Sequence, residues 1–193
     1  MKQQIDDLSI HSLSSDRWAD FELLFGSRGA CGGCWCMYWK LPLKVFEENQ
    51  GSGNRSMQKA IVEQGSPPGV IAYVDGIPAG WCAIEPRENY SRFEKARTLK
   101  PIDDLPVWSI TCFFIKKEYR NLGLSKALLR GAVEYALKSG ANVIEGYPHD
   151  LGASKLPDPF VYTGLVSSFK SIGFVEVARR SEKRPIMRYY QKS

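Results

Sequence analysis

The sequence has little histidine and no long hydrophobic run. His11 and His149 are the only histidines, and no window approaches the roughly 20 consecutive apolar residues that a membrane-spanning helix needs. The first residues contain no apolar segment of the kind found in secretory signals, so we expect a cytoplasmic protein without a membrane partner. The net charge of +5, from 26 basic and 21 acidic residues, is too small to indicate a nucleic-acid partner.

Four catalytic signatures are also missing from the sequence. Without Gly-x-x-x-x-Gly-Lys-Ser/Thr the chain is not a P-loop nucleotidase, and without Gly-x-Gly-x-x-Gly it is not a dinucleotide-binding Rossmann domain. Without His-Glu-x-x-His it is not a zincin, and without Gly-x-Ser-x-Gly it lacks the nucleophile elbow of a hydrolase. These absences exclude several large classes of enzyme.

The five cysteines do not form a recognisable framework. Their number is odd, which argues against a set of disulfides. Three of them lie in the run Cys31-Gly-Gly-Cys34-Trp-Cys36, and such a run can hold zinc, which takes about four nitrogen or sulfur ligands. Because no second Cys or His pair follows, we expect no metal and favour half-buried thiols in a pocket or core. A zinc or redox protein built on this run is the alternative.

The overall composition is typical of a soluble globular protein. Hydrophobic residues make up 44% and aromatic residues 12% of the chain, which is enough for a hydrophobic core. Since no linker stands out, we expect one domain over residues 1–193. Its N-terminal part, about residues 12–65, is predicted to be mainly helical.

The first half is predicted to contain three helices and three strands. Asn54 is expected to cap the third helix, and Asp75-Gly76 to form a hairpin turn, since that turn requires positive φ. The polar connection 85–107 is either a wall of the substrate site or an insertion without a role. The expected elements are strands 8–11, 70–74 and 77–84 and helices 17–25, 42–48 and 55–64.

The second half alternates between strands and helices. This alternation, after a helical first half and a hairpin, predicts an α/β (α+β) domain with a mixed sheet. The expected elements are strands 108–115, 143–147, 174–178 and 186–190 and helices 124–139 and 161–173.

A short basic loop connects strand 108–115 to helix 124–139. At the start of a helix the N–H groups have no partner within the helix, and the helix dipole makes this end positive. The amides of residues 121–125 therefore predict a phosphate site. Gly123 has no Cβ to block an anion, and Arg120 and Lys126 add positive charge. The alternative is an ordinary turn from strand to helix.

The loop sequence Arg120-Asn-Leu-Gly123-Leu-Ser125 resembles the Arg/Gln-x-x-Gly-x-Gly/Ala motif of the GNAT N-acetyltransferase superfamily, with Ser as the last small residue. The Gly173-Phe174 pair and the order of elements from about residue 8 to 190 strengthen this resemblance. It implies a mixed, mostly antiparallel central sheet of about six or seven strands flanked by helices. It also implies a cofactor-binding core at about residues 108–174, with the sheet splayed between strands 108–115 and 143–147.

The resemblance further implies that the chain binds acetyl-CoA. The loop amides would hold the pyrophosphate, and the end of strand 108–115 would pair with the pantetheine arm as an added strand. A backbone N–H there would polarise the thioester carbonyl. The implied cofactor-binding residues are Phe113, Phe114, Ile115, Arg120, Asn121, Leu122, Gly123, Leu124, Ser125 and Lys126.

The implied reaction is direct transfer of the acetyl group to an amine in a ternary complex. An ammonium group must first lose a proton, and Glu145, a carboxylate in an apolar strand, is our candidate base; a salt-bridged Glu is the alternative. His149 and Asp150 are weaker candidates. The Tyr that serves as acid in many relatives corresponds here to Phe169, so Tyr162, expected about two turns earlier on the same helix, is the candidate substitute.

Several alternatives remain at this stage. Phe169 also fits a non-catalytic module that binds or senses acyl-CoA, and Cys112 is a candidate acyl carrier in a covalent route. The acceptor is not identified, and the resemblance is compatible with a homodimer. We expect the acceptor pocket to be built from residues 26–48, 85–107 and 147–162, with side chains that suit an apolar or cationic group. These side chains are Trp35, Met37, Tyr38, Trp39 and Trp81, which are equally compatible with the core.

Overall fold

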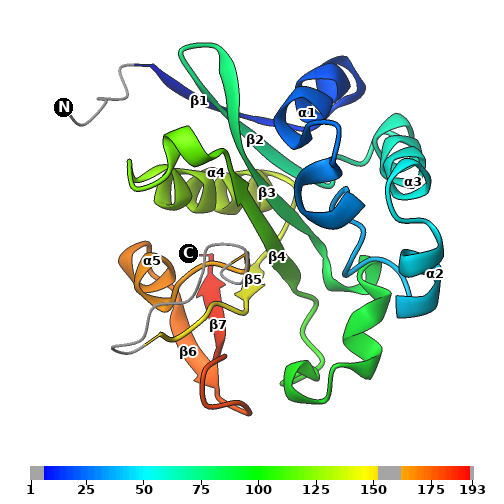
Figure 1. Cartoon of the computed structure of the whole chain (residues 1–193). Coiled ribbons are helices and arrows are strands. Elements are labelled where there is room, and N and C mark those ends of the chain that lie inside the picture. Colours follow the sequence, from blue (N-terminus) through cyan, green and yellow to red (C-terminus); the bar gives the residue numbers. More distant parts are fainter. Residues whose placement is uncertain (1–6, 152–161, 192–193) are drawn as a thin grey trace.

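A seven-stranded mixed sheet forms the centre of the molecule (Figure 1). The computed structural model describes residues 7–151 and 162–191. Along the sheet the strand order is β1-β2-β3-β4-β5-β7-β6, and only the β4–β5 pair is parallel. This confirms the predicted mixed, mostly antiparallel sheet. The strands are β1 (Leu8–Ser12), β2 (Gly69–Val74), β3 (Ile77–Pro86), β4 (Trp108–Ile115), β5 (Val143–Gly146), β6 (Val175–Ala178) and β7 (Ile186–Tyr190).

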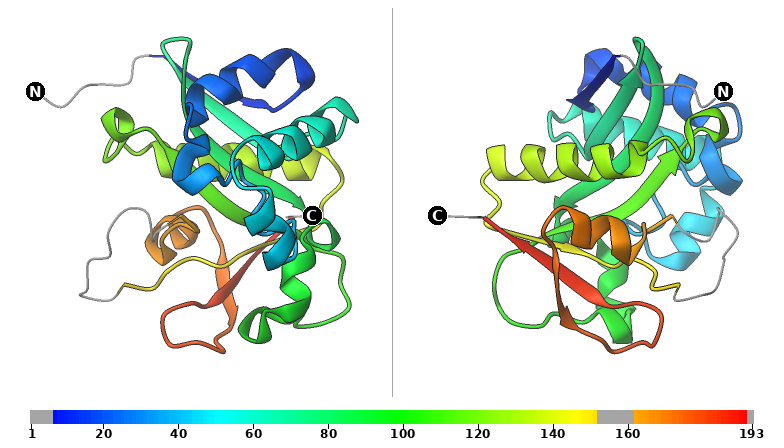
Figure 2. Two further views of the ribbon diagram at one scale, coloured as in Figure 1. Left: turned by 45° about the vertical axis from the view of Figure 1, so that its right-hand side comes forward. Right: turned by 90° about the vertical axis from the view of Figure 1, so that its left-hand side faces the viewer.

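Helices cover both faces of the sheet (Figure 2). Alternate side chains of β2 belong to two different hydrophobic clusters, because successive side chains of a strand point to opposite faces of the sheet. Val70, Ala72 and Val74 pack with α4, whereas Ile71 and Tyr73 pack with α1. No helix in the described part of the chain is long and apolar enough to cross a membrane. The helices are α1 (Trp18–Phe25), α2 (Leu43–Glu48), α3 (Ser52–Glu63), α4 (Leu124–Lys138) and α5 (Val166–Ser171).

The sheet is splayed between β4 and β5, as predicted. The two strands pair only from Trp108 opposite Ile144 to Ile110 opposite Gly146, and β4 then continues to Ile115 without β5. A β-bulge lies at the same point: Ile110 pairs with Ile84 and Cys112 with Ala83, which leaves Thr111 without a partner on β3. A bulge bends and twists its strand, so it helps to direct the end of β4 away from β5.

The predicted cap at Asn54 is wrong. Helix α3 begins two residues earlier, at Ser52, so Asn54 lies inside the helix and is fully buried. Its side-chain amide donates hydrogen bonds to the carbonyls of Gly33 (3.2 Å) and Phe46 (3.3 Å). The side chain therefore connects the segment around Gly33 and helix α2 to α3 instead of capping a free helix end.

The predicted helix 161–173 is much shorter in the structure. Helix α5 covers only Val166–Ser171, and Leu165 is extended, with φ −114° and ψ 142°. Gly164, at φ +86°, interrupts the apolar pattern that favoured a longer helix. Tyr162 thus precedes α5, so the prediction that it lies on the same helix as Phe169, about two turns earlier, is wrong. Residue 161, the predicted start of this helix, lies outside the described residues.

The connection between β3 and β4 is not simply a polar loop. It forms short 3-10 turns at Arg87–Asn89, Ser91–Lys95 and Arg97–Leu99. Its apolar side chains are buried with residues from distant segments, and this third hydrophobic cluster covers the sheet near the end of β5. The buried members are Trp39, Tyr90, Phe93, Leu99, Tyr147 and Ile186.

Candidate functional site

The loop between β4 and α4 presents a row of backbone N–H groups. Asn121 and Gly123 have positive φ, +62° and +84°, conformations that Gly adopts freely and Asn tolerates. In the described part of the chain, no backbone carbonyl accepts a hydrogen bond from the N–H groups of residues 121–125. A Cβ built at Gly123 would have no atom within 4 Å, so the loop is open to an approaching ligand. This arrangement can hold a phosphate.

The side chains around this loop differ in their contacts and in their exposure to solvent. Arg120 donates from Nε to the Ile115 carbonyl (3.1 Å), which fastens the loop to the end of β4. Lys126 is exposed on the first turn of α4, whereas Leu124 is buried in the core. Leu124 can therefore offer only its backbone N–H to a ligand.

A segment of the chain itself lies in the opening between β4 and β5. The Phe113 N–H donates to the Tyr162 carbonyl (2.5 Å), and the His149 N–H donates to the Gly164 carbonyl (2.8 Å). The Val166 N–H donates to the His149 carbonyl (3.1 Å). Residues 162–166 thus run between β4 and the continuation of β5, where the pantetheine arm was expected. Sequence reasoning did not find this contact.

The phenyl rings of β4 point to opposite faces of the sheet. Phe113 contacts Phe169 edge-on, with ring centroids 6.2 Å apart, and Phe114 contacts Phe25 at 5.4 Å on the α1 side. Phe169 is fully buried and also contacts Phe174. The residue that replaces the usual Tyr therefore packs in the core behind the opening.

Glu145 is a buried carboxylate beside the opening. It pairs in register with Ser109, is 1% exposed, and lies with Oε2 3.5 Å from Arg188 Nε. Arg188 also donates to both carboxylate oxygens of Asp103 (2.6 and 2.9 Å), a partner that sequence reasoning missed. Burial raises the pKa of Glu145, and the nearby positive charge of Arg188 opposes this shift. Glu145 is therefore salt-bridged, which was the alternative interpretation of this residue. Its role as a catalytic base remains a prediction.

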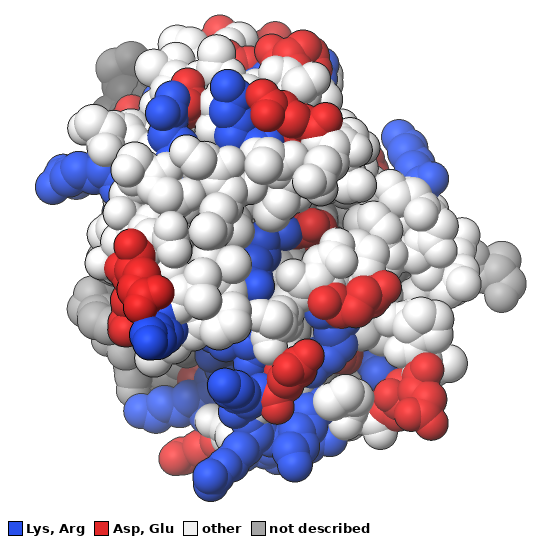
Figure 3. All heavy atoms as spheres, turned by 90° about the vertical axis from the view of Figure 1, so that its right-hand side faces the viewer, with Lys and Arg blue, Asp and Glu red and all other residues white. Residues whose placement is uncertain are grey.

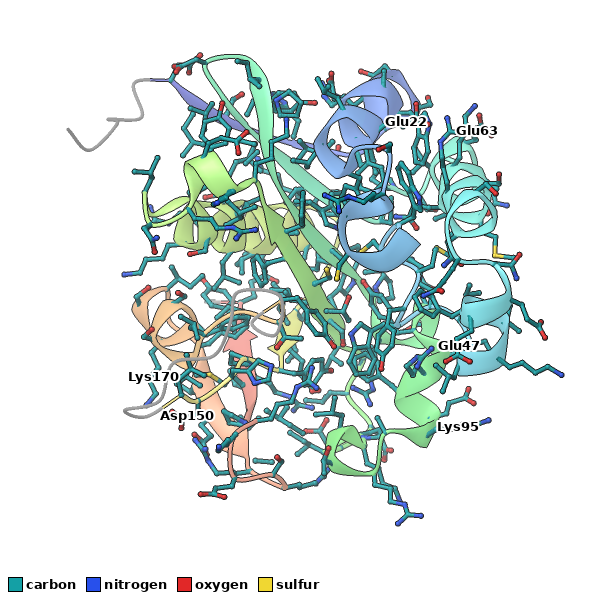
Figure 4. The ribbon with its side chains drawn as sticks, in the orientation of Figure 1. Glu22, Glu47, Glu63, Lys95, Asp150 and Lys170 are labelled. Carbon is teal, nitrogen blue, oxygen red and sulfur yellow. The ribbon has the colours of Figure 1, made fainter. Side chains whose placement is uncertain are left out.

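The Tyr162 side chain lies next to the Arg184 guanidinium. Burial is the main cause that raises the pKa of Tyr162, so the phenol keeps its proton at neutral pH. Burial also lowers the pKa of His149, and the charge of Arg184 acts in the same direction. Asp150 lies at the outer edge of the molecule (Figure 4), where its carboxylate is paired with Arg179 at 2.9 Å. The structure thus brings Tyr162 and His149 together around Arg184, with Asp150 outside.

The cysteines gather without forming a metal site. The Trp81 indole N–H donates to Cys36 Sγ (3.1 Å), and the Cys36 N–H contacts Cys34 Sγ (3.2 Å). A hydrogen bond with Cys112 lowers the pKa of Cys36, whereas burial raises the pKa of Cys34 to about 12. Cys31 is exposed. In residues 7–151 and 162–191, no three His, Cys, Asp or Glu side chains are placed to hold a metal ion.

Most side chains that we assigned to an acceptor pocket are part of the core. Trp35, Met37, Trp39 and Trp81 are buried, and only Tyr38 is substantially exposed, at 37%. Sequence reasoning missed Arg92 and Arg184, which stack on Tyr38 and Trp39. No local pattern marks these two arginines, since they come from segments far apart in the chain.

Comparisons with known proteins agree with this geometry. No curated protein sequence matches the chain. Its fold matches a PaiA N-acetyltransferase from Thermoplasma acidophilum in complex with coenzyme A, at 16% identity over 96% of this chain and 99% of that chain (TM-score 0.53). It also matches a GNAT-family acetyltransferase from Streptococcus agalactiae, at 13% identity over 98% of both chains (TM-score 0.58).

A third structure has a bound cofactor, and the family model decides the classification. The putative acetyltransferase yncA from Salmonella typhimurium, with its cofactor acetyl-CoA, is 11% identical over 95% of this chain and 93% of that chain (TM-score 0.53). The model of the acetyltransferase (GNAT) family matches residues 35–154, more than half of the chain. This range includes the splayed strands β4 and β5 and the loop between β4 and α4. The chain therefore belongs to the GNAT acetyltransferase family.

Proposed function

We propose that this protein is an N-acetyltransferase that moves the acetyl group of acetyl-CoA directly to an amine in a ternary complex. The observation that carries the proposal is the row of amides at 121–125, which donate to no carbonyl among the described residues and follow a strand that has separated from its neighbour. The amides suit a pyrophosphate, and the part of β4 beyond its pairing with β5 suits an extended arm, which would displace residues 162–166 from this edge. The complexes of related folds with coenzyme A and acetyl-CoA support this choice.

The cofactor-binding roles follow from these positions. The amides of residues 121–125 and the exposed Lys126 would bind the pyrophosphate, while Arg120 fixes the loop to Ile115. The backbone of β4 from Phe113 to Ile115 would pair with the pantetheine arm. A β4 amide next to the bulge would donate to the thioester carbonyl, where negative charge develops during acyl transfer.

The proposed base is Glu145. Replacing it in Glu145→Gln keeps the shape of the side chain but removes the proton acceptor, and we expect kcat to fall about 100-fold. The affinity for acetyl-CoA should not change. Because burial raises the pKa of Glu145, the wild-type rate should fall as the pH drops through this raised value, and the variant should lose that acidic limb. The measurements are kcat against pH and calorimetric titration with acetyl-CoA.

The matched control is Glu134→Gln, on the exposed side of α4. It removes the same charge away from the opening and should leave the pH profile intact. An unchanged acidic limb in Glu145→Gln would show that another group, or water, accepts the proton.

The proposed acid is Tyr162, whose protonated phenol can donate to the departing thiolate. Tyr162→Phe should lower kcat at least about tenfold with little effect on the dissociation constant of acetyl-CoA. Tyr135→Phe is the control, because it removes a hydroxyl that donates to the Pro67 carbonyl (2.9 Å) on another part of the molecule. Equal rates for the two variants would remove Tyr162 from the mechanism.

The function itself is tested by adding acetyl-CoA to a panel of amines. We expect acetyl-CoA to bind in the micromolar range by calorimetry, and free thiol to appear together with an acetylated amine of the expected mass. Acetyl-CoA binding without transfer to any amine would favour the alternative of an acyl-CoA-sensing module. No binding would reject both. A cytoplasmic location is also proposed, since all five cysteines are free thiols, the state that a reducing compartment maintains.

A further inference from the structure

Two arginines stack on adjacent aromatic rings near the opening between β4 and β5. Arg92, in the 3-10 turn Ser91–Lys95, lies with its guanidinium carbon 3.9 Å from the centroid of Tyr38. Arg184, between β6 and β7, lies 5.4 Å from the centroid of Trp39. The two rings meet edge to face at 5.5 Å. Two positive charges from distant segments are therefore held on one pair of rings.

These guanidinium groups have buried nitrogens that lack a partner. In the described part of the chain, no acceptor reaches Nε and Nη2 of Arg92 or Nη2 of Arg184, although all three atoms are inaccessible to solvent. Neither arginine has a carboxylate within 4.0 Å among the described residues. Buried donors without an acceptor are costly, and a charged acceptor is their best partner.

Two cations that are more deeply buried than Arg92 and Arg184 do have carboxylate partners. Lys40 is paired with Glu85, and Arg188 is paired with Asp103 and Glu145. The contrast shows that the fold can supply carboxylates to buried basic groups, but supplies none here. Lys and Arg side chains also gather on the lower part of the face that carries α2 and segment 87–100 (Figure 3). The region has an excess of positive charge.

Arg184, one of these two arginines, adjoins the proposed site of acetyl transfer. Arg184 Nε donates to the Tyr147 carbonyl (3.2 Å), one residue beyond the last β4–β5 pair at Gly146. Arg184 also lies beside the Tyr162 side chain. The backbone carbonyl of Tyr162 accepts a hydrogen bond from the Phe113 N–H. An anionic group bound by these arginines would therefore place the rest of its molecule next to β4.

We propose that Arg92 and Arg184 bind a carboxylate of the acceptor, so that the acceptor is an amino acid or another small amine that carries a carboxylate. The inference rests on the proposed acetyltransferase function and specifies its substrate class. A guanidinium group can bind a carboxylate with two parallel hydrogen bonds, which also orients the ligand. The faces of Tyr38 and Trp39 are already occupied by these cations, so a cationic acceptor is not expected to stack there.

The test compares each free amino acid with its own carboxamide, at saturating acetyl-CoA, by thiol release and product mass. The preferred amino acid should have a kcat/KM about 10 to 100 times that of its amide, because the amide cannot make the charged hydrogen bonds. Arg92→Gln should raise KM for the acid by a similar factor, and the ratio of kcat/KM between the acid and its amide should fall toward one. Arg184→Gln should raise the same KM.

The control is Lys95→Gln, in the same 3-10 turn as Arg92. Its side chain is exposed at the outer edge of the molecule (Figure 4), and its loss should change neither KM. Calorimetric titration with acetyl-CoA shows that each variant is folded, and Arg184→Lys, which keeps the charge, should recover part of the loss. Equal use of acid and amide would overturn the carboxylate site while leaving the transferase proposal intact. Acetyl-CoA binding without acetylation of either compound would overturn the transferase proposal itself.

Discussion

Replacing Gly123 by valine is expected to abolish acetyl-CoA binding, with a loss of at least about 100-fold in affinity. Gly123 is at φ +84° and ψ −2°, a left-handed conformation that a β-branched residue adopts only under strain. To relieve the strain the loop must change its dihedral angles, and the amides of 121–125 would then no longer point to one place. Calorimetric titration with acetyl-CoA measures the effect directly.

Helix α4 provides a closely matched control for this experiment. Gly140, just beyond its C-terminal end, is at φ +93°, and like Gly123 it has no atom within 4 Å of an added Cβ. Gly140→Val therefore introduces comparable backbone strain at the opposite end of the same helix. We expect it to lower stability while leaving acetyl-CoA affinity unchanged. Equal affinities for the two variants would contradict the assignment of the phosphate loop.

Lys40→Met is expected to cost about 3–5 kcal/mol of unfolding free energy. Lys40 is 8% exposed and Glu85 is 3% exposed, and the two form an ion pair that also receives a hydrogen bond from Asn89 (3.3 Å). Removing the ammonium group leaves the Glu85 charge in the interior without its counter-charge. Denaturant unfolding, followed by fluorescence, gives the change in free energy.

Two further variants separate the missing charge from the lost packing. The double variant Lys40→Met with Glu85→Met removes both charges, and it should recover most of the stability. Lys44→Met breaks an exposed pair with Glu48 at 3.9 Å and should change stability by less than about 1 kcal/mol. If the double variant is as unstable as Lys40→Met, packing rather than charge explains the loss.

The turn from β4 into α4 and the strands of the sheet could be predicted because their signals are local. The strand, the positive-φ glycine and the helix follow one another within 115–138, and the alternation of each strand is visible in the sequence. Each closing strand was also predicted within about one residue of its observed bounds. The features that could not be predicted depend on contacts between segments far apart in the sequence.

The errors and omissions arise from such contacts or from patterns that fit two structures. Asn is suited both to capping a helix and to bonding neighbouring carbonyls, so Asn54 could not be placed from its type alone. The apolar spacing of residues 161, 165, 169 and 172 predicted a long helix, although Gly164 was a visible signal for a break. The Arg188–Asp103 pair joins residues 85 positions apart, and nothing near either residue marks the other.

The hydrogen bond between the Phe113 N–H and the Tyr162 carbonyl occupies the edge of β4 that the proposed pantetheine arm would need. Residues 162–166 therefore compete with this ligand for the same backbone groups. Residues 162–166 are held next to β4 at a high effective concentration, so an extended ligand that needs the same edge must displace them. The observed affinity is then the intrinsic affinity multiplied by the fraction of molecules in which this edge is free. Sequence changes in residues 163–166 can therefore tune the occupancy of the site without altering the groups that we propose to touch the ligand.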